Sequence, residues 1–262
     1  MIELAIFFSK ITFKMLKFVP AKNALQNKTI LITGAGSGIG KTAAIEFAKY
    51  GATVILLGRT VKKLESVYDE IVNAGFPEPA IVPLDMQGAT KKHYQDMADT
   101  ITNQFGKLDG LLQNASILGH LEPFKQIDED IFNQVMQVNV TSQFLMTQAL
   151  LKPLELAPNA SVIFTTSTVG SQGRAYWGSY SISKFATEGM MQVLADEYAE
   201  TSIRFNCINP GATRTSMRAK AFPAEDASTL KTPQEIMPLY LYLMSDESSK
   251  ENGNTFAAQP KS

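Results

Sequence analysis

A tyrosine and a lysine four residues apart, Tyr180 and Lys184, could together move a proton. On a helix this spacing places both side chains on one face, one turn apart. A phenol, with a pKa near 10, exchanges protons poorly at pH 7, and a neighbouring ammonium group favours its anion. Lowering the pKa of Tyr180 by about 3 units takes roughly 4 kcal/mol. The pair is therefore a candidate general acid and base.

This spacing is distinctive within the chain. Of the eight tyrosines, only Tyr180 has a lysine at the fourth following position. Such pairs also occur on exposed helix faces without any catalytic role, which is the alternative interpretation. Ser167 lies thirteen residues before Tyr180, at the end of a predicted strand. We therefore expect Ser167, Tyr180 and Lys184 to meet at the ligand-binding edge of a sheet.

The stretch ITGAGSGIGKT, at 32–42, could bind phosphate groups in two ways. A P-loop for a nucleoside triphosphate needs G-x-x-x-x-G-K-[ST], which Gly40, Lys41 and Thr42 complete, but its first glycine would fall at Ala35. The alternative is T-G-x-x-x-G-x-G between a strand and a helix, which binds the pyrophosphate of a dinucleotide. The mismatch of one residue favours the dinucleotide.

In the dinucleotide interpretation each glycine has its own task. Gly34 makes the sharp turn after the strand, Gly38 lets the backbone approach the pyrophosphate, and Gly40 permits close packing of the helix. The helix N-terminus offers unpaired N–H groups to the phosphates. Glycine-rich turns also connect strands to helices without any ligand, so this pattern needs support from the rest of the chain.

The elements that would position these residues follow from a regular alternation along the chain. Short apolar runs predict seven strands, at 29–33, 53–57, 80–84, 108–113, 161–166, 203–208 and 254–258. Segments of helical period predict helices near 38–50, 61–74, 90–105, 128–152, 179–199 and 232–246. The strands are mostly continuous apolar runs, which indicates a parallel sheet with helices on both faces. We expect one doubly wound α/β domain over residues 28–262, with an insertion at 210–233 over the site.

Composition narrows the class of ligand. The chain has 262 residues, a net charge of -1 and a pI near 6.2, so we expect a small-molecule ligand and no nucleic acid. The single cysteine, Cys207, excludes an internal disulfide and fits a reducing cytoplasm. His93 and His120 are the only histidines, and we expect no metal site.

Residues 1–27 precede the domain pattern and form a predicted N-terminal extension. Their apolar beginning lacks the basic region and the cleavage site of a signal peptide, and three lysines interrupt any membrane span. One interpretation is that translation starts at Met15, so that residues 1–14 are an artefact or a disordered tail. The other is an amphipathic helix on a membrane surface. We favour the first interpretation.

Together these motifs resemble those of the short-chain dehydrogenases/reductases, a family of one-domain, NAD(P)-dependent enzymes. The resemblance covers residues 28–258 and rests on TGAGSGIG at 33–40, LD at 84–85, QNAS at 113–116, VNV at 138–140, Ser167, YSISK at 180–184 and NPGATRT at 209–215. INPGATRTSMRAKAFP and TPQEIMPLYLYLM look similar to the bacterial YciK-like group of this family. The resemblance implies a Rossmann fold and hydride transfer between nicotinamide and an alcohol or carbonyl compound.

The resemblance places the family's catalytic residues on Ser167, Tyr180, Lys184 and Asn139. It implies that Tyr180 takes the alcohol proton in oxidation and donates one in reduction, its pKa lowered by Lys184 and the positive nicotinamide ring. Ser167 would hold the substrate oxygen, and Asn139 a water that connects Lys184 with solvent. A capping or solvent-facing role is the alternative for Asn139.

The resemblance also assigns residues to the cofactor. Asp85 and Met86 would border the adenine, and Asn114 and Ala115 the ribose. The complete predicted set is Thr33, Gly34, Gly36, Ser37, Gly38, Ile39, Gly40, Arg59, Asp85, Met86, Asn114, Ala115, Tyr180, Lys184, Pro210, Gly211, Thr213 and Thr215.

The end of the second predicted strand, ILLGRT, bears on the choice of cofactor. Relatives that use NAD have an acidic residue there, for the ribose hydroxyls, whereas this chain has Gly58 followed by Arg59. A planar guanidinium suits a 2′-phosphate, so we expect NADP(H) to be preferred, with NAD(H) as a second possibility. A surface arginine without a ligand is the alternative for Arg59.

One motif departs from the family. Its N-A-G is Asn114-Ala115-Ser116 here, and serine accepts the backbone geometry of glycine less well, which leaves the local geometry open. Other loop residues are candidates for the substrate pocket, with apolar walls at Leu118, Trp177, Met217 and Phe222 and contacts to an anionic group at Arg174 and Arg218.

Two further expectations concern assembly and turnover. The resemblance implies a homodimer or homotetramer formed through the helices at 128–152 and 179–199. A sensor or scaffold that binds NADP without turnover is the competing function. The complete Ser-Tyr-Lys-Asn set argues against it, because a protein that only binds has no use for a tyrosine paired with lysine.

Overall fold

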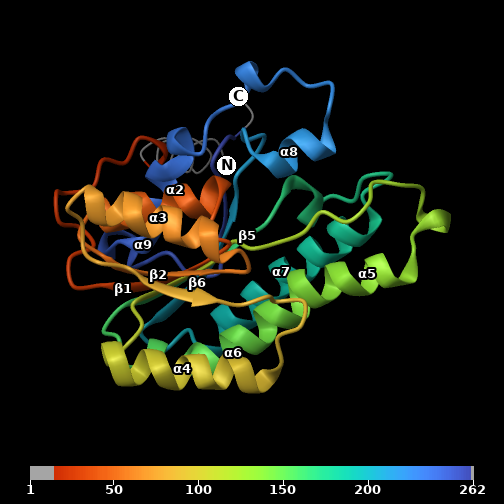
Figure 1. Ribbon diagram of the computed structural model, residues 1–262. Helices are drawn as coiled ribbons and strands as arrows, with labels where there is room; N and C mark the ends of the chain where they lie inside the picture. Colours follow the sequence, from red (N-terminus) through yellow and green to blue (C-terminus); the bar gives the residue numbers. More distant parts are fainter. Residues whose placement is uncertain (1–14, 261–262) are drawn as a thin grey trace, which may run out of the picture.

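Seven parallel strands form one β-sheet in the computed structural model, which describes residues 15–260 (Figure 1). The strands are β1 (Thr29–Thr33), β2 (Thr53–Gly58), β3 (Ala80–Pro83), β4 (Gly110–Gln113), β5 (Ala160–Thr165), β6 (Ile203–Asn209) and β7 (Thr255–Ala257). Their order in the sheet is β3-β2-β1-β4-β5-β6-β7, and every neighbouring pair is parallel. The strand order reverses between β1 and β4, where open α/β sheets bind their ligands. The predicted seven-stranded parallel sheet is confirmed.

Helices cover both faces of the sheet (Figure 1). They are α2 (Gly38–Lys49), α3 (Val61–Asn73), α4 (Lys91–Phe105), α5 (Glu129–Met136), α6 (Ser142–Glu155), α7 (Gly178–Glu197), α8 (Ser216–Ala221) and α9 (Met237–Met244). One core packs α2, α3 and α9 against the sheet, with Phe47 and Tyr240 fully buried. The other packs α4, α6 and α7 around Phe164 and Phe205. Because both faces are covered, most of the strands are continuous apolar runs, and β6, with Arg204 and Asn206, is the exception.

The helix predicted at 128–152 is interrupted. The structure has α5, then a π-helical turn at Gln137–Thr141, then α6. Asp128 caps α5, since its carboxylate accepts hydrogen bonds from the N–H groups of Asp130 and Ile131. Single π-helical turns inside helices often lie at functional sites. Asn139 occupies this one.

Part of the predicted N-terminal extension packs against the domain. Met15 is 4% exposed and Leu25 fully buried, both in the core beside α2 and α9. Phe18 makes an edge-to-face contact with Tyr242, with ring centroids 5.4 Å apart. Residues 1–14, on which the proposals of an internal start and of a membrane-surface helix depend, lie outside the described residues. Within residues 15–260 no helix combines the length and apolar character needed to span a membrane.

Candidate active site

The glycine turn between β1 and α2 has the backbone geometry expected of a phosphate-binding loop. Gly34 and Gly38 have φ values of +69° and +54°, which favour glycine. A Cβ atom on Gly40 would lie 2.3 Å from the carbonyl oxygen of Gly34, so only glycine fits where α2 packs on the turn. The turn at Gly34 and the close packing at Gly40 therefore suit the tasks expected of them, and the approach of Gly38 to a pyrophosphate stays a prediction.

The N-terminus of α2 is open to an anion. Ser37, its N-cap residue, makes no side-chain capping bond, and the first turn contains no acidic residue. Its N–H groups and the helix dipole are thus available to phosphate oxygens. Lys41, which a P-loop would need over the phosphates, instead pairs with Glu70 of α3 at 2.7 Å. The triphosphate interpretation fails on this geometry as well as on spacing.

Thr33 joins the ends of β1 and β4. Its hydroxyl oxygen accepts hydrogen bonds from the N–H groups of Asn114 at 2.9 Å and Ala115 at 2.8 Å. The Asn114 amide donates to the Thr33 carbonyl at 3.2 Å. These bonds bring the predicted residues of two sequence motifs together at the point where the strand order reverses.

The loop after β6 lies over the glycine turn. The Thr215 methyl carbon is 3.4 Å from the position that a Cβ atom on Gly38 would occupy. Gln259 holds this loop, because its amide nitrogen donates to the carbonyl oxygens of Pro210 at 2.9 Å and Ala212 at 3.0 Å, and to the Thr213 hydroxyl at 3.3 Å. Gln259 was not predicted, since it follows β7 and no motif marks it.

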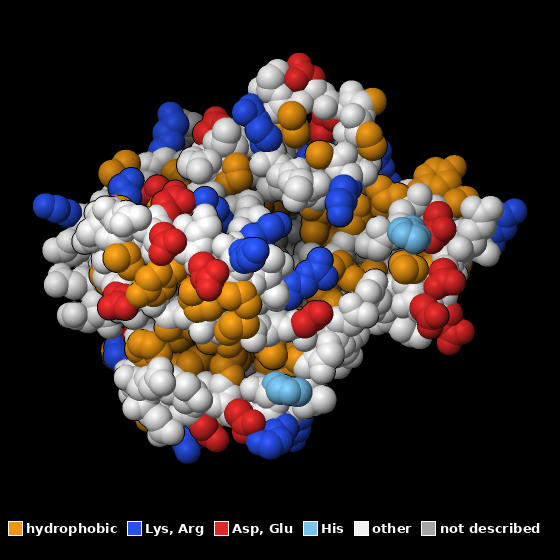
Figure 2. Space-filling model, viewed as in Figure 1, with side chains coloured by type: hydrophobic (Ala, Val, Ile, Leu, Met, Phe, Trp, Pro, Cys, Tyr) orange, Lys and Arg blue, Asp and Glu red, His pale blue; other side chains and the backbone are white. Residues whose placement is uncertain are grey.

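Basic side chains lie on the adenosine side of the turn. Arg59 is exposed at the end of β2, and the Cβ of Lys63 is 3.0 Å from the position of a Cβ on Gly36. The ion pairs found within residues 15–260 include neither Arg59 nor Lys63. Figure 2 shows Lys and Arg side chains around the hollow beneath the α8 segment. Lys63 was missed, although its place four residues after Arg59 was a usable signal.

The predicted adenine residues differ in exposure. Asp85 is exposed after β3, and its carboxylate accepts a hydrogen bond from the Gln87 N–H at 3.1 Å. Met86 is 5% exposed, and its carbonyl accepts a hydrogen bond from the Ser142 hydroxyl. The structure thus leaves the Asp85 side chain accessible and fixes the backbone of Met86 against α6.

Tyr180 and Lys184 share one buried face of α7. The Lys184 Nζ atom lies 5.5 Å from the centroid of the Tyr180 ring. Lys184 is 1% exposed and Tyr180 is 7% exposed. Nζ donates a hydrogen bond of 2.7 Å to the carbonyl oxygen of Thr165, the last residue of β5. Ser167 follows two residues later, in an extended conformation before the 3₁₀ turn at Thr168–Gly170. Lys184 and Tyr180 therefore lie at this end of β5, with Ser167 two residues beyond it, and the meeting of the Ser167 hydroxyl with Tyr180 stays a prediction.

The ionisation of the pair is governed mainly by burial. Burial raises the pKa of Tyr180 to about 12, with a smaller lowering by hydrogen bonding from the Ser116 side chain. Burial also lowers the pKa of Lys184 to about 8, against raising effects of Cys207 and Glu188. In the protein without cofactor, loss of hydration dominates at this phenol, and the expected lowering of its pKa by Lys184 and the nicotinamide ring together stays a prediction. At neutral pH the phenol is protonated and the lysine charged.

Asn139 and Ser116 form a second layer beside Tyr180. The Asn139 amide accepts from the N–H of Ile117 at 2.8 Å and donates to its carbonyl at 2.9 Å and to the Ser183 hydroxyl at 3.0 Å. Asn139 is fully buried, which excludes the solvent-facing alternative. Both neighbours of Ser116 are thus held, Ile117 by Asn139 and Ala115 by Thr33. The sequence marked Ser116 only as a departure from glycine and gave no indication that it acts on Tyr180.

Aromatic and basic residues lie on the substrate side of Tyr180. The Trp177 ring is 5.9 Å from that of Tyr180 and 5.7 Å from that of Phe222, which follows α8. The Arg218 guanidinium stacks on Phe222 at 3.8 Å and forms a bidentate ion pair with Glu225 at 2.5 and 2.6 Å. Trp177 thus lies beside both Tyr180 and Phe222, and a role of Trp177 and Phe222 as walls of a substrate pocket stays a prediction. Arg218 is already neutralised, so it is poorly suited to bind an anionic substrate group.

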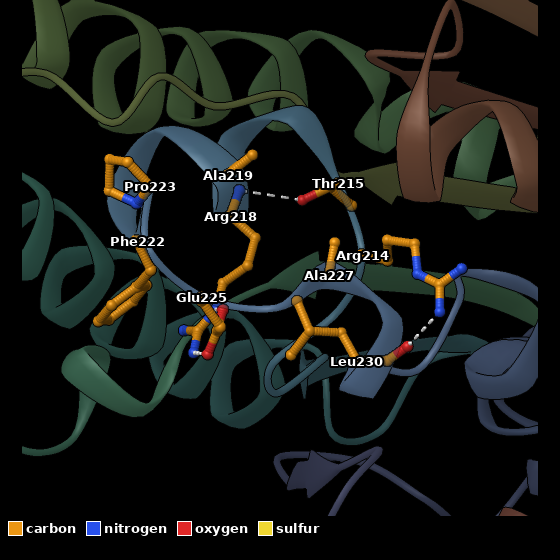
Figure 3. Close-up of a pocket in the computed structure, with 9 residues that line it drawn as sticks. All are labelled: Arg214, Thr215, Arg218, Ala219, Phe222, Pro223, Glu225, Ala227 and Leu230. Carbon is orange, nitrogen blue, oxygen red and sulfur yellow. Dashed lines mark hydrogen bonds and ion pairs between the residues drawn. The ribbon is translucent and has the colours of Figure 1, made fainter.

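A small cavity lies within the α8 segment (Figure 3). Its volume is about 60 Å³, and its lining residues are Arg214, Thr215, Arg218, Ala219, Phe222, Pro223, Glu225, Ala227 and Leu230. A space of this size holds a few water molecules at most. The cavity is therefore a packing space beneath α8 and too small for a substrate.

The fold and this site define an oxidoreductase of the Rossmann type, and a protein-family comparison agrees. The family model for short chain dehydrogenases matches residues 28–226, and the chain belongs to this family. The oxidoreductase YciK of Escherichia coli K12 is 51% identical over 243 residues, which cover 93% of this chain and 96% of YciK. The predicted family and its YciK-like group are confirmed.

Solved structures of similar chains agree with this. A short chain dehydrogenase from Salmonella enterica serovar Typhi is 53% identical, with a TM-score of 0.92, covering 93% of this chain and 100% of that one. One from Escherichia coli CFT073, complexed with NADPH, is 51% identical, with a TM-score of 0.90 and coverage of 92% and 100%. One from Shigella flexneri 2a, complexed with NADP, is 50% identical, with the same TM-score and coverage. Two relatives thus bind the cofactor expected from the sequence.

Proposed function

We propose that this chain is an NADPH-dependent reductase of carbonyl compounds. The carrying observation is the buried face of α7, where Tyr180 and Lys184 lie beside the end of β5 and next to the turn suited to pyrophosphate. The bound cofactor would supply the hydride. Tyr180 would donate its proton to the carbonyl oxygen, and Ser167 would hold that oxygen in place by a hydrogen bond.

The ionisation of the site without cofactor suits Tyr180 as the proton donor that carbonyl reduction needs. With its pKa raised to about 12, the Tyr180 phenol carries a proton at every physiological pH. Lys184, with its pKa lowered to about 8, is charged at pH 7. It can therefore stabilise the phenolate that forms as the proton leaves. A water held at the π-helical turn would restore the proton to Tyr180. Both hydrogens of the Asn139 side-chain amide already donate hydrogen bonds, so the backbone would have to bind that water.

The proposed cofactor site follows the open edge of the sheet. The N-terminus of α2 and the Thr215 hydroxyl would bind the pyrophosphate, Asn114 and Ala115 would line the ribose, and Asp85 would border the adenine. Arg59 and Lys63 would face the 2′-phosphate. Two observations support this role of Arg59 and Lys63. Within residues 15–260 neither side chain forms an ion pair, and two relatives are complexed with NADP or NADPH.

We expect Arg59→Ala to weaken NADPH binding about 10- to 100-fold, because one charge-assisted hydrogen bond contributes about 1.5–3 kcal/mol. NADH, which lacks the phosphate, should bind equally to the variant and to the wild type. Fluorescence titration of both cofactors measures this. Lys152→Ala removes an exposed positive charge from α6, far along the chain, and is the control. If both variants lost NADPH affinity equally, the loss would come from the change in net charge and would contradict a contact between Arg59 and the 2′-phosphate.

Turnover is tested by a panel of aldehydes and ketones with NADPH, followed at the absorbance band of reduced nicotinamide. Alcohols with NADP⁺ test the reverse direction. We expect several carbonyl compounds to be reduced, faster with NADPH than with NADH. Tight NADPH binding without turnover of any member would instead support a sensor or scaffold.

The proposed assembly is a homodimer formed through α6 and α7. Four large apolar side chains on these helices are exposed: Phe144 at 49%, Ile182 at 39%, Phe185 at 46% and Val193 at 56%. A partner that covers them would bury a continuous apolar surface. We expect sedimentation to show a dimer or tetramer that Phe185→Glu converts to monomer; a wild-type monomer at high concentration would contradict the proposal. A reducing cytoplasm is the proposed location, in keeping with the single free cysteine, Cys207.

A further inference from the structure

The face of α7 that carries Tyr180 and Lys184 continues to an acidic residue with no role in the mechanism above. Glu188 lies four residues after Lys184, one helical turn further on. It is 9% exposed, and carboxylates are rarely buried unless they are paired. Tyr180, Lys184 and Glu188 thus form a row of three titratable groups along one side of the helix.

The Glu188 carboxylate is held over β6 and β7. The Thr255 hydroxyl donates a hydrogen bond of 2.5 Å to one of its oxygens, Oε2. Thr255 is the register partner of Cys207 on the neighbouring strand, and after burial the Glu188 charge contributes to raising the pKa of the Cys207 thiol. The other carboxylate oxygen, Oε1, is buried and has no hydrogen-bond partner within the described chain. The carboxylate is therefore fixed in place without being neutralised by a salt bridge.

Lys184 needs a negative charge nearby. Its ammonium group is buried and donates to one carbonyl oxygen, that of Thr165 on β5. The titratable groups that act on it are Tyr180 and Glu188 on its own helix and Cys207 on β6. Burial raises the pKa values of Tyr180 and Cys207, so the phenol and the thiol are both neutral at pH 7. Among these groups, Glu188 alone can supply the opposite charge.

We propose that Glu188 is a positioning residue: its buried carboxylate, held by Thr255, keeps the Lys184 ammonium charged beneath Tyr180. Glu188 acts through Lys184 and takes no direct part in proton transfer. The consequence for catalysis rests on the proposed reductase function. The coupling between Glu188 and Lys184 does not, and it can be measured without substrate or cofactor.

The test uses the pH dependence of unfolding. The pKa of Lys184 is lowered to about 8 in the folded chain and is about 10.4 when unfolded. Above pH 8 the unfolded chain therefore binds more protons at Lys184 than the folded chain does. The contribution of Lys184 to the free energy of unfolding consequently rises with pH. Glu188→Gln should lower the folded pKa by about one unit, so that the rise begins near pH 7.

We therefore expect the Glu188→Gln variant to unfold at lower urea concentration than the wild type. This deficit in the free energy of unfolding should narrow as the pH rises from 6 to 8. Groups that the substitution leaves unchanged cancel in this comparison. Glu197→Gln makes the same change at an exposed position near the end of α7, and should show no such trend. In a Lys184→Met background, the deficit caused by Glu188→Gln should become independent of pH.

If the stability deficit caused by Glu188→Gln is instead independent of pH, and equal with and without Lys184, the proposal is overturned. Glu188 then has a structural role only. Should Glu188→Gln fail to fold, Thr255→Val is the second variant, since it removes the hydroxyl that stabilises the carboxylate. It should show the same dependence on pH at smaller size. Absence of that dependence counts equally against the proposal. For any carbonyl compound that is reduced, the fall of kcat with rising pH should begin about one unit lower in Glu188→Gln. If none is reduced, the reductase function fails while the urea comparison still decides the coupling.

Discussion

Tyr180→Phe is expected to reduce kcat for carbonyl reduction by about 10²- to 10⁴-fold, the range typical of a lost general acid. The substitution removes only the hydroxyl, and the ring can still stack on Trp177, 5.9 Å away. NADPH affinity should fall by about tenfold at most, since one hydrogen bond contributes about 0.5–1.5 kcal/mol. Initial rates and NADPH titration of wild type and variant give both quantities.

Tyr176→Phe is the matched control for this change. Tyr176 is four residues earlier and 61% exposed, so loss of its hydroxyl should leave kcat unchanged. A Tyr180→Phe variant as active as Tyr176→Phe would remove the acid from the mechanism.

Gly40→Ala should weaken NADPH binding more than about 100-fold and lower the free energy of unfolding by about 1–3 kcal/mol, the usual range for overpacking. The added Cβ would lie 2.3 Å from the Gly34 carbonyl oxygen and 2.8 Å from the Asn114 amide nitrogen. Both belong to the framework of the site, so α2 has to move away from the turn. NADPH titration and urea unfolding measure the two effects.

Gly88→Ala serves as the control, because a Cβ there has no neighbour within 4 Å and the residue has no positive φ. It should change neither quantity appreciably. If Gly40→Ala bound NADPH as the wild type does, α2 would not be the part of the site that receives the pyrophosphate.

The sheet could be predicted because its inner strands are buried on both faces and most of their sequences are continuous apolar runs. The interruption between α5 and α6 could not. Its π-helical turn contains Asn139, whose amide bonds the backbone of Ile117, a segment distant in the chain. The packing of Met15 and Leu25 was missed for a similar reason, since it depends on contacts with a core that includes α9, far along the chain.

Site residues within motifs were predicted because the spacing of a helix or turn fixes their geometry locally. A residue outside the motifs, Gln259, was missed, and so was the role of Ser116 inside one of them. Gln259 reaches the loop after β6 from beyond β7, and Ser116 affects Tyr180 across the sheet edge. The raised pKa of Tyr180 in the protein without cofactor was not foreseen, since helical spacing reveals the neighbouring lysine but does not reveal how completely the phenol is buried.

The most direct test of the account is to follow the hydride itself. NADPH carrying deuterium at the transferable position of its nicotinamide is incubated with the enzyme and a carbonyl compound that the panel shows to be reduced. The account predicts that mass spectrometry finds one deuterium on the former carbonyl carbon of the alcohol, formed by the wild type and hardly at all by Tyr180→Phe. An unlabelled alcohol, or equal labelling by both proteins, would contradict it.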